Sequence, residues 1–298
     1  MQARKPVVAG QFYPVQRSAC IDQIKQCLQA PRLPGGIQER GESLPETIVA
    51  GIVPHAGWTF SGDLAALVFS AMKKRHKKVD TFVVFGAAHG YFGESSALYD
   101  KGSWMTPLGE VGVDEELAEA VLSTGAAVSD PSAHGSEHSI EVQVPFIQYL
   151  FAGAKILPII VPPTEQAVSL GTKVGDIIGR EHSKKIICIS STDLTHYGPR
   201  YSFVPMGTGS EALAWAGTVN DQRFIDLALK LQPRELLASA AENCNACGPG
   251  AAAAAIAAAK QLGKTEGLLL AHTNSSDVML REMGTVSLDS VGYAAVVF

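Results

Sequence analysis

The sequence predicts a single three-layer α/β/α domain with a mostly parallel central sheet. Short apolar runs rich in valine and isoleucine alternate with helical patterns along the 298 residues, as is typical of a sheet covered by helices on both faces. No internal repeat or second domain boundary interrupts this pattern, so we expect residues 1–298 to form one domain. A composition of 46% hydrophobic and 18% charged residues excludes general disorder and allows a sizeable core.

Six apolar runs are the expected strands of this sheet. Each has the length of an ordinary strand. In chain order they are 47–54, 81–87, 155–161, 185–190, 267–273 and 292–298.

Helical patterns fill the intervals between these strands. They cover 61–75, 114–123, 164–180, 221–231 and the alanine-rich run 251–259. Ser61 and Asp114 are expected to cap the first two helices, because their side chains accept hydrogen bonds from free amides. The alanine-rich helix follows Pro249, whose missing amide proton costs nothing in a first turn, and its small side chains predict a closely packed, buried helix. The proline- and glycine-rich segment 31–45 is expected to be a surface connection.

Charge and composition exclude several classes of function. The net charge of −5 has the wrong sign for neutralising phosphate backbones, so no nucleic-acid partner is expected. The run 251–259 is too short to span a bilayer and the first residues lack a secretory apolar region, so neither a membrane partner nor export is expected. Five irregularly spaced cysteines indicate a reducing compartment, and we therefore expect a cytoplasmic protein.

Polar residues gather directly after three of the expected strands. His55 and His89 follow the first two strands, and Asp193 with His196 follows a later one. Ligands bind at this edge of such sheets, and glycines beside His55 and His89 leave room for one. Four other histidines are expected to be structural or surface residues: His76, His134, His182 and His272.

A second cluster is Glu137-His138-Ser139-Ile140-Glu141. If a helix begins here, His138 and Glu141 lie on one face and present a proton-transfer pair. Acidic residues are equally common in a first helical turn for dipole reasons. Both interpretations stay open at this point.

Cys244 and Cys247 have C-x-x-C spacing. No second such pair and no suitably spaced histidine completes a zinc site. Cys247 directly precedes the glycine that opens the alanine-rich helix, and the helix dipole there favours a thiolate. Buried structural roles are expected for Cys20, Cys27 and Cys188.

Nitrogen, oxygen and sulfur ligands are thus expected to converge from separate segments. The set is His55, His89, Asp193, His196 and Cys247. Such sets with open positions are typical of mononuclear centres in which iron activates oxygen, and zinc or copper accept similar ligands. We therefore expect one metal ion, iron first, with copper or zinc as alternatives. His138, Glu141 and His196 would supply acid–base or supporting contacts.

Five motifs, in this order, resemble those of the Memo family, also called AmmeMemoRadiSam system protein B. They are Pro54-His55-Ala56-Gly57-Trp58, Gly86-x-x-His89, Glu137-His138-Ser139-Ile140-Glu141, Ser190-Ser191-x-Asp193-x-x-His196-Tyr197-Gly198 and Cys247-Gly248. The opening segment 9–14 is also similar to that of the family, so the resemblance covers nearly the whole chain. The family is similar in fold to class III extradiol ring-cleaving dioxygenases, which implies a metal site at the strand ends.

The resemblance also implies roles for individual residues and for partners. It implies that His55, His89 and Cys247 ligate the metal, while Cys244 is not implied. Three further residues would line the same pocket: Asp193, His196 and His138. The ring-cleaving relatives use two histidines and a glutamate, so a cysteine ligand departs from their pattern. The second family name implies a functional link to a radical SAM protein and an AMMECR-type protein.

Three functions compete on this sequence. The leading hypothesis is a metal-dependent redox enzyme acting on a small or aromatic substrate, in a pocket walled by Trp58, Tyr91 and Tyr197. The alternative is a non-enzymatic adaptor that binds a metal or a peptide in the same pocket. The third is a cysteine hydrolase that uses Cys247 with His138 and Glu141.

Overall fold

The computed structural model describes residues 3–29 and 43–298. The strands of its main sheet are β1 (Ala50–Val53), β2 (Thr81–Gly86), β3 (Ser96–Leu98), β6 (Ala127–Ser129), β7 (Lys155–Ile160), β8 (Ile186–Ser191), β9 (His196–Tyr197), β10 (Leu268–Asn274) and β11 (Ser290–Val297). Their order is β10-β11-β1-β8-β2-β7-β3-β6, and β9 pairs with β11. Strands β4 (Ser103–Thr106) and β5 (Gly109–Gly112) form a separate pair.

The centre of the sheet is parallel, antiparallel pairs flank it, and the edge strand β6 pairs in parallel with β3. Strands β1, β8, β2 and β7 pair in parallel, and β1, β2 and β8 are buried along their whole length. Burial on both faces explains their continuous apolar sequences. Antiparallel pairing joins β11 to β1 and to β10, and joins β3 to β7. The expected fold class is therefore confirmed, and the antiparallel pairs are an addition to it.

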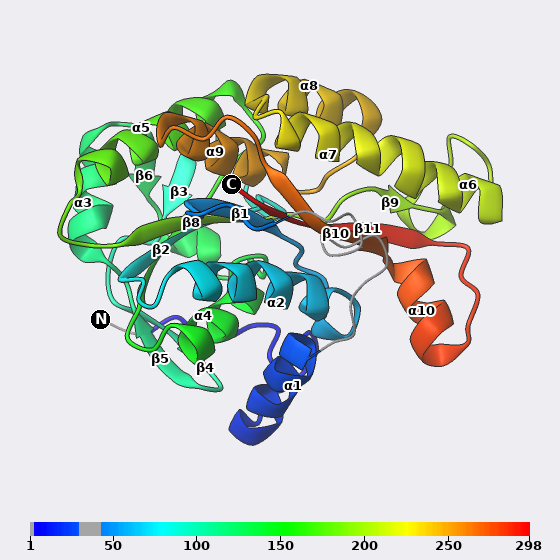
Figure 1. The fold of residues 1–298 in the computed structure, drawn as a ribbon, viewed down its shortest axis with the longest axis horizontal. Coiled ribbons are helices and arrows are strands. Elements are labelled where there is room, and N and C mark those ends of the chain that lie inside the picture. Colours follow the sequence, from blue (N-terminus) through cyan, green and yellow to red (C-terminus); the bar gives the residue numbers. More distant parts are fainter. Residues whose placement is uncertain (1–2, 30–42) are drawn as a thin grey trace.

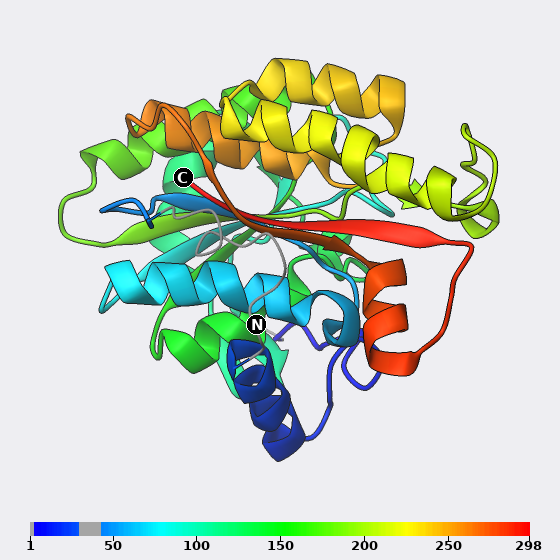
Figure 2. The ribbon, with the colours of Figure 1, turned by 45° about the vertical axis from the view of Figure 1, so that its right-hand side comes forward.

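Helices cover both faces of this sheet (Figure 1). One face carries α1 (Arg17–Gln29), α2 (Trp58–Arg75), α4 (Val144–Leu150) and α10 (Ser275–Met283). The other carries α3 (Glu115–Ser123), α5 (Glu165–Arg180), α7 (Gln222–Leu229), α8 (Pro233–Asn243) and α9 (Pro249–Gln261). Helix α6 (Ser210–Trp215) precedes α7, from which the π-helical turn Ala216–Asp221 separates it. Figure 2 shows the sheet edge-on between α2 and α9.

Most expected elements form, with shifted ends. Asp114 caps α3 as expected, accepting from the Leu117 amide. Ser61 does not cap α2, because that helix already begins at Trp58. The Ser61 hydroxyl instead donates to the Ala56 carbonyl oxygen. Helices α1, α6, α8 and α10 were not expected. Most of the expected connection 31–45 lies outside the described residues. No helix within the described ranges is long and apolar enough to cross a membrane.

Close packing of α5 on α9 sets the position of the alanine-rich helix. A Cβ atom added at Gly171 would lie 2.1 Å from the Ala254 carbonyl oxygen. We expect Gly171→Ala to lower the free energy of unfolding by about 1–3 kcal/mol, because the two backbones must separate. Chemical denaturation measures this change. In the control Gly179→Ala, the new atom meets only a Leu262 methyl at 3.8 Å; equal stability of both variants would contradict the packing argument.

Candidate metal centre

Five side chains from separate segments gather at one edge of the sheet. His55 and His89 follow β1 and β2, and Asp193 follows β8, which lies between these two strands. His138 lies in the loop before α4, and Cys247 lies just before α9. The carboxyl ends of parallel strands share an edge. This is how the fold brings together residues as far apart in sequence as His55 and Cys247.

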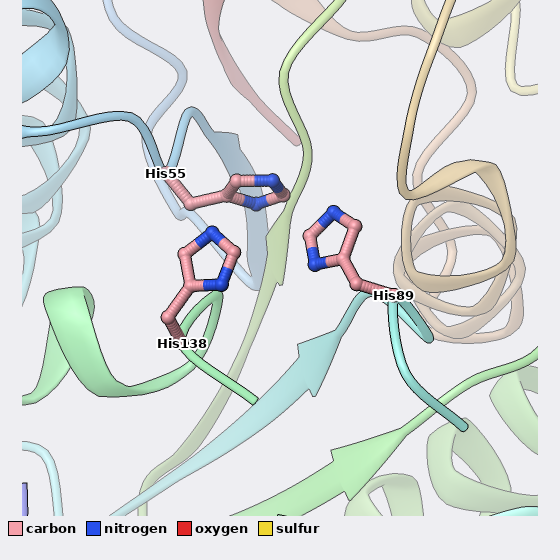
Figure 3. A group of neighbouring side chains, drawn as sticks. All are labelled: His55, His89 and His138. Atoms are coloured by element: carbon pink, nitrogen blue, oxygen red, sulfur yellow. The ribbon is translucent and has the colours of Figure 1, made fainter. Parts of the chain in front are cut away.

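The ligand atoms form two sets that share one residue. Among the described residues, atoms of His55, His89 and His138 lie within 4.8 Å of one another, and so do atoms of His55, Asp193 and Cys247. Figure 3 shows the first set, with three imidazole rings turned toward a common space. Of the three expected ligands, His89 belongs only to the first set, Cys247 only to the second, and His55 to both. His138 joins the possible ligands, a role that was not expected for it.

His55 is held with its Nε2 atom directed at Cys247. The Ser191 hydroxyl donates to the Ser139 carbonyl oxygen at 2.7 Å, so it accepts from His55 Nδ1 at 3.2 Å. The Nε2 lone pair then faces Cys247 Sγ at 3.1 Å. Burial lowers the pKa of His55 well below its usual range, and neighbouring imidazoles lower it further. A neutral imidazole held in this way is suited to ligate a metal through Nε2.

Glu137 holds His89 in the same manner. One carboxylate oxygen lies 3.1 Å from His89 Nδ1, and the other accepts from the His89 backbone amide. Burial lowers the pKa of His89, but the bond to Glu137 and its charge outweigh burial, so the pKa is raised. A carboxylate bound to Nδ1–H is the usual support of a metal-ligating histidine. Glu137 therefore belongs to the site, although only its motif, and no role for it, was noted from the sequence.

His138 and His196 complete the imidazole cluster. The His138 ring stacks on His89 with centroids 4.9 Å apart and planes at 10°, and burial lowers the pKa of His138. His196 Nδ1 lies 3.0 Å from the Leu194 carbonyl oxygen, and burial lowers its pKa as well. Both residues line the cavity described below. As neutral imidazoles they can accept a proton there, which is consistent with the acid–base roles expected from the sequence.

The Cys247 thiol is protonated in the protein alone. Burial raises its pKa, and the charge of Asp193 raises it further. The dipole of α9 was expected to favour the thiolate, but desolvation of the charged form outweighs it. The thiolate therefore stays a prediction for the protein with a bound cation. A metal that binds sulfur here has to displace the thiol proton.

Asp193 anchors the turn that carries His55. Its Oδ1 accepts the His55 amide hydrogen at 2.7 Å, and Oδ2 lies 4.0 Å from His55 Nε2. No helix begins at Leu194, which instead bridges to Ala246, so Asp193 does not cap a helix. Burial raises the pKa of Asp193 to about 7, against the lowering effect of two backbone amides. The carboxyl can thus hold or release a proton near neutral pH.

Replacing Asp193 by asparagine separates its two roles. Asn keeps an oxygen that can accept from the His55 amide, so the melting temperature of Asp193→Asn should stay near that of the wild type. Metal affinity or turnover should fall by about 10–100-fold, as is typical when a group that orients a ligand is lost. Competition titration with a chelator measures the affinity. Full metal content together with full ligand binding in this variant would refute a functional role for Asp193.

Glu141 is turned away from the imidazoles. Its carboxylate accepts from the Arg4 guanidinium at 2.8 Å and the Tyr13 hydroxyl at 2.9 Å, and from two backbone amides of the same N-terminal segment. Among the described residues no hydrogen bond joins it to His138, and it does not line the cavity. The structure thus does not assemble the predicted proton-transfer pair. Glu141 instead ties the N-terminal segment to the loop that carries His138.

A cavity of about 760 Å³ lies over the imidazole cluster. The expected walls do not line it: Trp58 and Tyr197 are buried, each bound to a backbone carbonyl, and Tyr91 donates to Ser95. These three rings lie close to the histidine motifs in sequence, but their side chains point away from the cavity. The apolar walls are instead Phe12, Phe60, Met279, Tyr201, Val291 and Tyr293.

The remaining cysteine and histidine predictions agree with the structure. Cys244 is exposed and belongs to neither ligand set among the described residues; it ends α8 with a φ of 50°. Other histidines are structural or on the surface: His76 and His134 face backbone carbonyls, His272 faces Asp221, and His182 is exposed.

Comparison with known proteins gives one consistent family. Residues 4–297 match the family model described as Memo-like protein. The MEMO1 family protein PAE0818 of Pyrobaculum aerophilum is 35% identical over 100% of this chain and 99% of its own length. The MEMO1 family protein of Thermococcus onnurineus is 36% identical, with 99% of each chain covered. A solved structure, the uncharacterized protein JW3007 from Escherichia coli K12, is similar in fold: its TM-score is 0.51 at 14% identity, covering 82% of this chain and 99% of its own.

Proposed function

This chain belongs to the Memo family, and on that premise we propose that it is a metal-dependent redox enzyme acting on a small aromatic molecule. One metal ion would be held by His55, His89 and Cys247. The substrate would occupy the adjoining cavity. The functional link to a radical SAM protein and an AMMECR-type protein is proposed on the family resemblance alone.

The single observation that carries this proposal is the position of His55 Nε2. His55 belongs to both groups of possible ligands, and its Nε2 lone pair faces a thiol 3.1 Å away. In His55 and in His89, Nδ1 is bound to another side chain, which leaves Nε2 for a metal. Imidazole and sulfur donors suit iron, copper or zinc and do not suit magnesium or calcium. The residues therefore fit the expected iron, copper or zinc ion.

Iron or copper bound here would supply one-electron redox chemistry and oxygen activation, and zinc would supply a Lewis acid. The chain itself supplies proton transfer and orientation. His138 and His196 are neutral bases beside the cavity, suited to accept the proton of a phenolic hydroxyl. Asp193, with a pKa of about 7, can store that proton. The aromatic rings of Phe12 and Phe60 would exclude water from the bound ring.

One observation supports an alternative set of metal ligands. The atoms of His55, His89 and His138 lie together within 4.8 Å, whereas His89 and Cys247 do not share a set. In this alternative His138 takes the third position and Cys247 stays a neutral thiol. We favour Cys247 because its Sγ atom contacts His55 Nε2, the nitrogen that would bind the metal. A metal ion at this position would replace the proton that the thiol and the imidazole share.

The other two functions have weaker support. A cysteine hydrolase would need Cys247 beside His138 and Glu141, but the thiol contacts His55, and Glu141 is bound to Arg4. A non-enzymatic adaptor would use the same cavity to recognise a metal or a peptide. The same cavity supports the adaptor and the enzyme equally, so only a test of turnover distinguishes these two functions.

Anaerobic purification followed by elemental analysis is the first test. The proposal expects close to one equivalent of iron or copper per chain. Oxygen uptake is then recorded with a panel of catechols, using iron-loaded protein and a chelator-treated control. Uptake that depends on both metal and catechol would support the enzyme. Tight stoichiometric metal binding with no uptake across the panel would reject the redox proposal and favour the adaptor.

A further inference from the structure

Part of the cavity is lined by residues outside the imidazole cluster. Its rim is formed by the turn Pro199–Tyr201, by α10 and by the segment after α10. Rim residues that line the cavity are Arg200, Ser275, Met279, Ser287 and Asp289. The proposed metal centre uses none of them.

The exposed Arg200 side chain has no partner among the residues that the structure describes. Three other arginines bind carboxylates: Arg4 binds Glu141, Arg234 binds Glu165, and Arg281 binds Glu282. Among the described residues no hydrogen bond or ion pair involves the Arg200 guanidinium, and only its backbone amide is bound. A guanidinium presents five donors in a fixed fork that matches a carboxylate. Here all of them are available to a ligand.

Arg200 and its neighbour Tyr201 both line the cavity. The Tyr201 ring packs edge-on against His196, with centroids 5.1 Å apart. Arg200 therefore lines the cavity beside Tyr201, whose ring contacts the imidazole cluster at His196.

The rim is held in place by Asp289. Its Oδ1 accepts the Arg200 backbone amide at 2.9 Å, which fixes the turn while leaving the guanidinium free. The Asp289 carboxylate repels any anion that binds Arg200, and it repels a doubly charged phosphate most strongly. The rim therefore suits a singly charged anion better than phosphate.

From this arrangement we infer that Arg200 forms a subsite for a carboxylate group, so that the molecules accepted by the cavity are aromatic carboxylates. The ring would lie between Phe12, Phe60 and Tyr293, and its carboxylate would face the rim. This inference rests on the proposed function only for the identity of the cavity as the substrate site. Arg200 would determine specificity and would take no part in the chemistry.

The test compares two ligands that differ only in charge. Phenylacetate and its neutral isostere phenylacetamide are titrated into chelator-treated protein by calorimetry, so that no metal can bind the carboxylate. We expect phenylacetate to bind about tenfold more tightly, as for a hydrogen bond to a charged group. In Arg200→Gln this ratio should fall close to one, and in Arg200→Lys it should partly return. Arg234→Gln, on α8 and outside this cavity, removes the same charge and should leave the ratio unchanged.

Three results would overturn the inference. They are equal affinities in the wild type, a preference that survives Arg200→Gln, and no phenylacetate binding in folded wild-type protein. The outcome is independent of the metal test. A carboxylate preference without oxygen uptake would reject the redox proposal alone, and uptake without the preference would reject the subsite alone.

Discussion

Replacing His55 by alanine is expected to abolish stoichiometric metal binding. His55 is the residue common to both sets of ligand atoms, so its loss disables either form of the centre. Affinity should fall by more than about 100-fold, beyond the 10–100-fold typical of residues that only orient a ligand. Elemental analysis after loading and dialysis measures the retained metal.

The control for this variant is His196→Ala. His196 lines the same cavity but belongs to neither ligand set, so this variant should retain its metal. Melting temperatures of both variants show whether metal loss reflects unfolding. A folded His55→Ala protein that keeps one equivalent of metal would contradict the proposed centre.

Replacing Arg4 by methionine is expected to cause the largest loss of stability. Arg4 and Glu141 form an ion pair with 5% and 1% side-chain exposure, and removing one partner leaves the other charge buried. Such losses cost about 3–5 kcal/mol. Arg4 also donates to the carbonyl oxygens of His134 and Glu137, so the loop that carries His138 should loosen as well. Urea denaturation measures the stability.

Two further variants test the explanation by charge. The double variant Arg4→Met with Glu141→Gln removes both charges and should recover part of the lost stability. Arg281→Met breaks an exposed pair with Glu282 and should change stability by no more than about 0.5 kcal/mol. An Arg4→Met protein as stable as Arg281→Met would show that the buried pair does not stabilise the fold.

The central part of the fold was predictable from the sequence because its strands are buried on both faces. Strands β1, β2 and β8 therefore read as continuous apolar runs. The short strands β3 and β6 have three residues each and carry too little pattern to be recognised. Helix α1 was missed because its sequence is mostly polar, with only Cys20, Ile24 and Cys27 buried.

The candidate site was predictable where topology alone decides position. His55, His89 and Asp193 follow parallel strands, so their meeting follows from strand order. The roles of Glu137 and Glu141 depend on which way a side chain turns inside one loop. Both are carboxylates in the same motif, yet Glu137 supports His89 and Glu141 binds Arg4. Arg4 lies 137 residues before Glu141, and no local pattern signals that contact.

Cobalt substitution tests the proposed ligand set most directly. Cobalt(II) bound to a thiolate has a sulfur-to-metal charge-transfer band that all-imidazole sites lack. The account predicts this band in the cobalt-loaded wild type, its loss in Cys247→Ser, and its retention in both Cys244→Ser and His138→Gln. A wild-type protein that binds one cobalt without the band, and loses cobalt in His138→Gln, would contradict the account and assign the third position to His138.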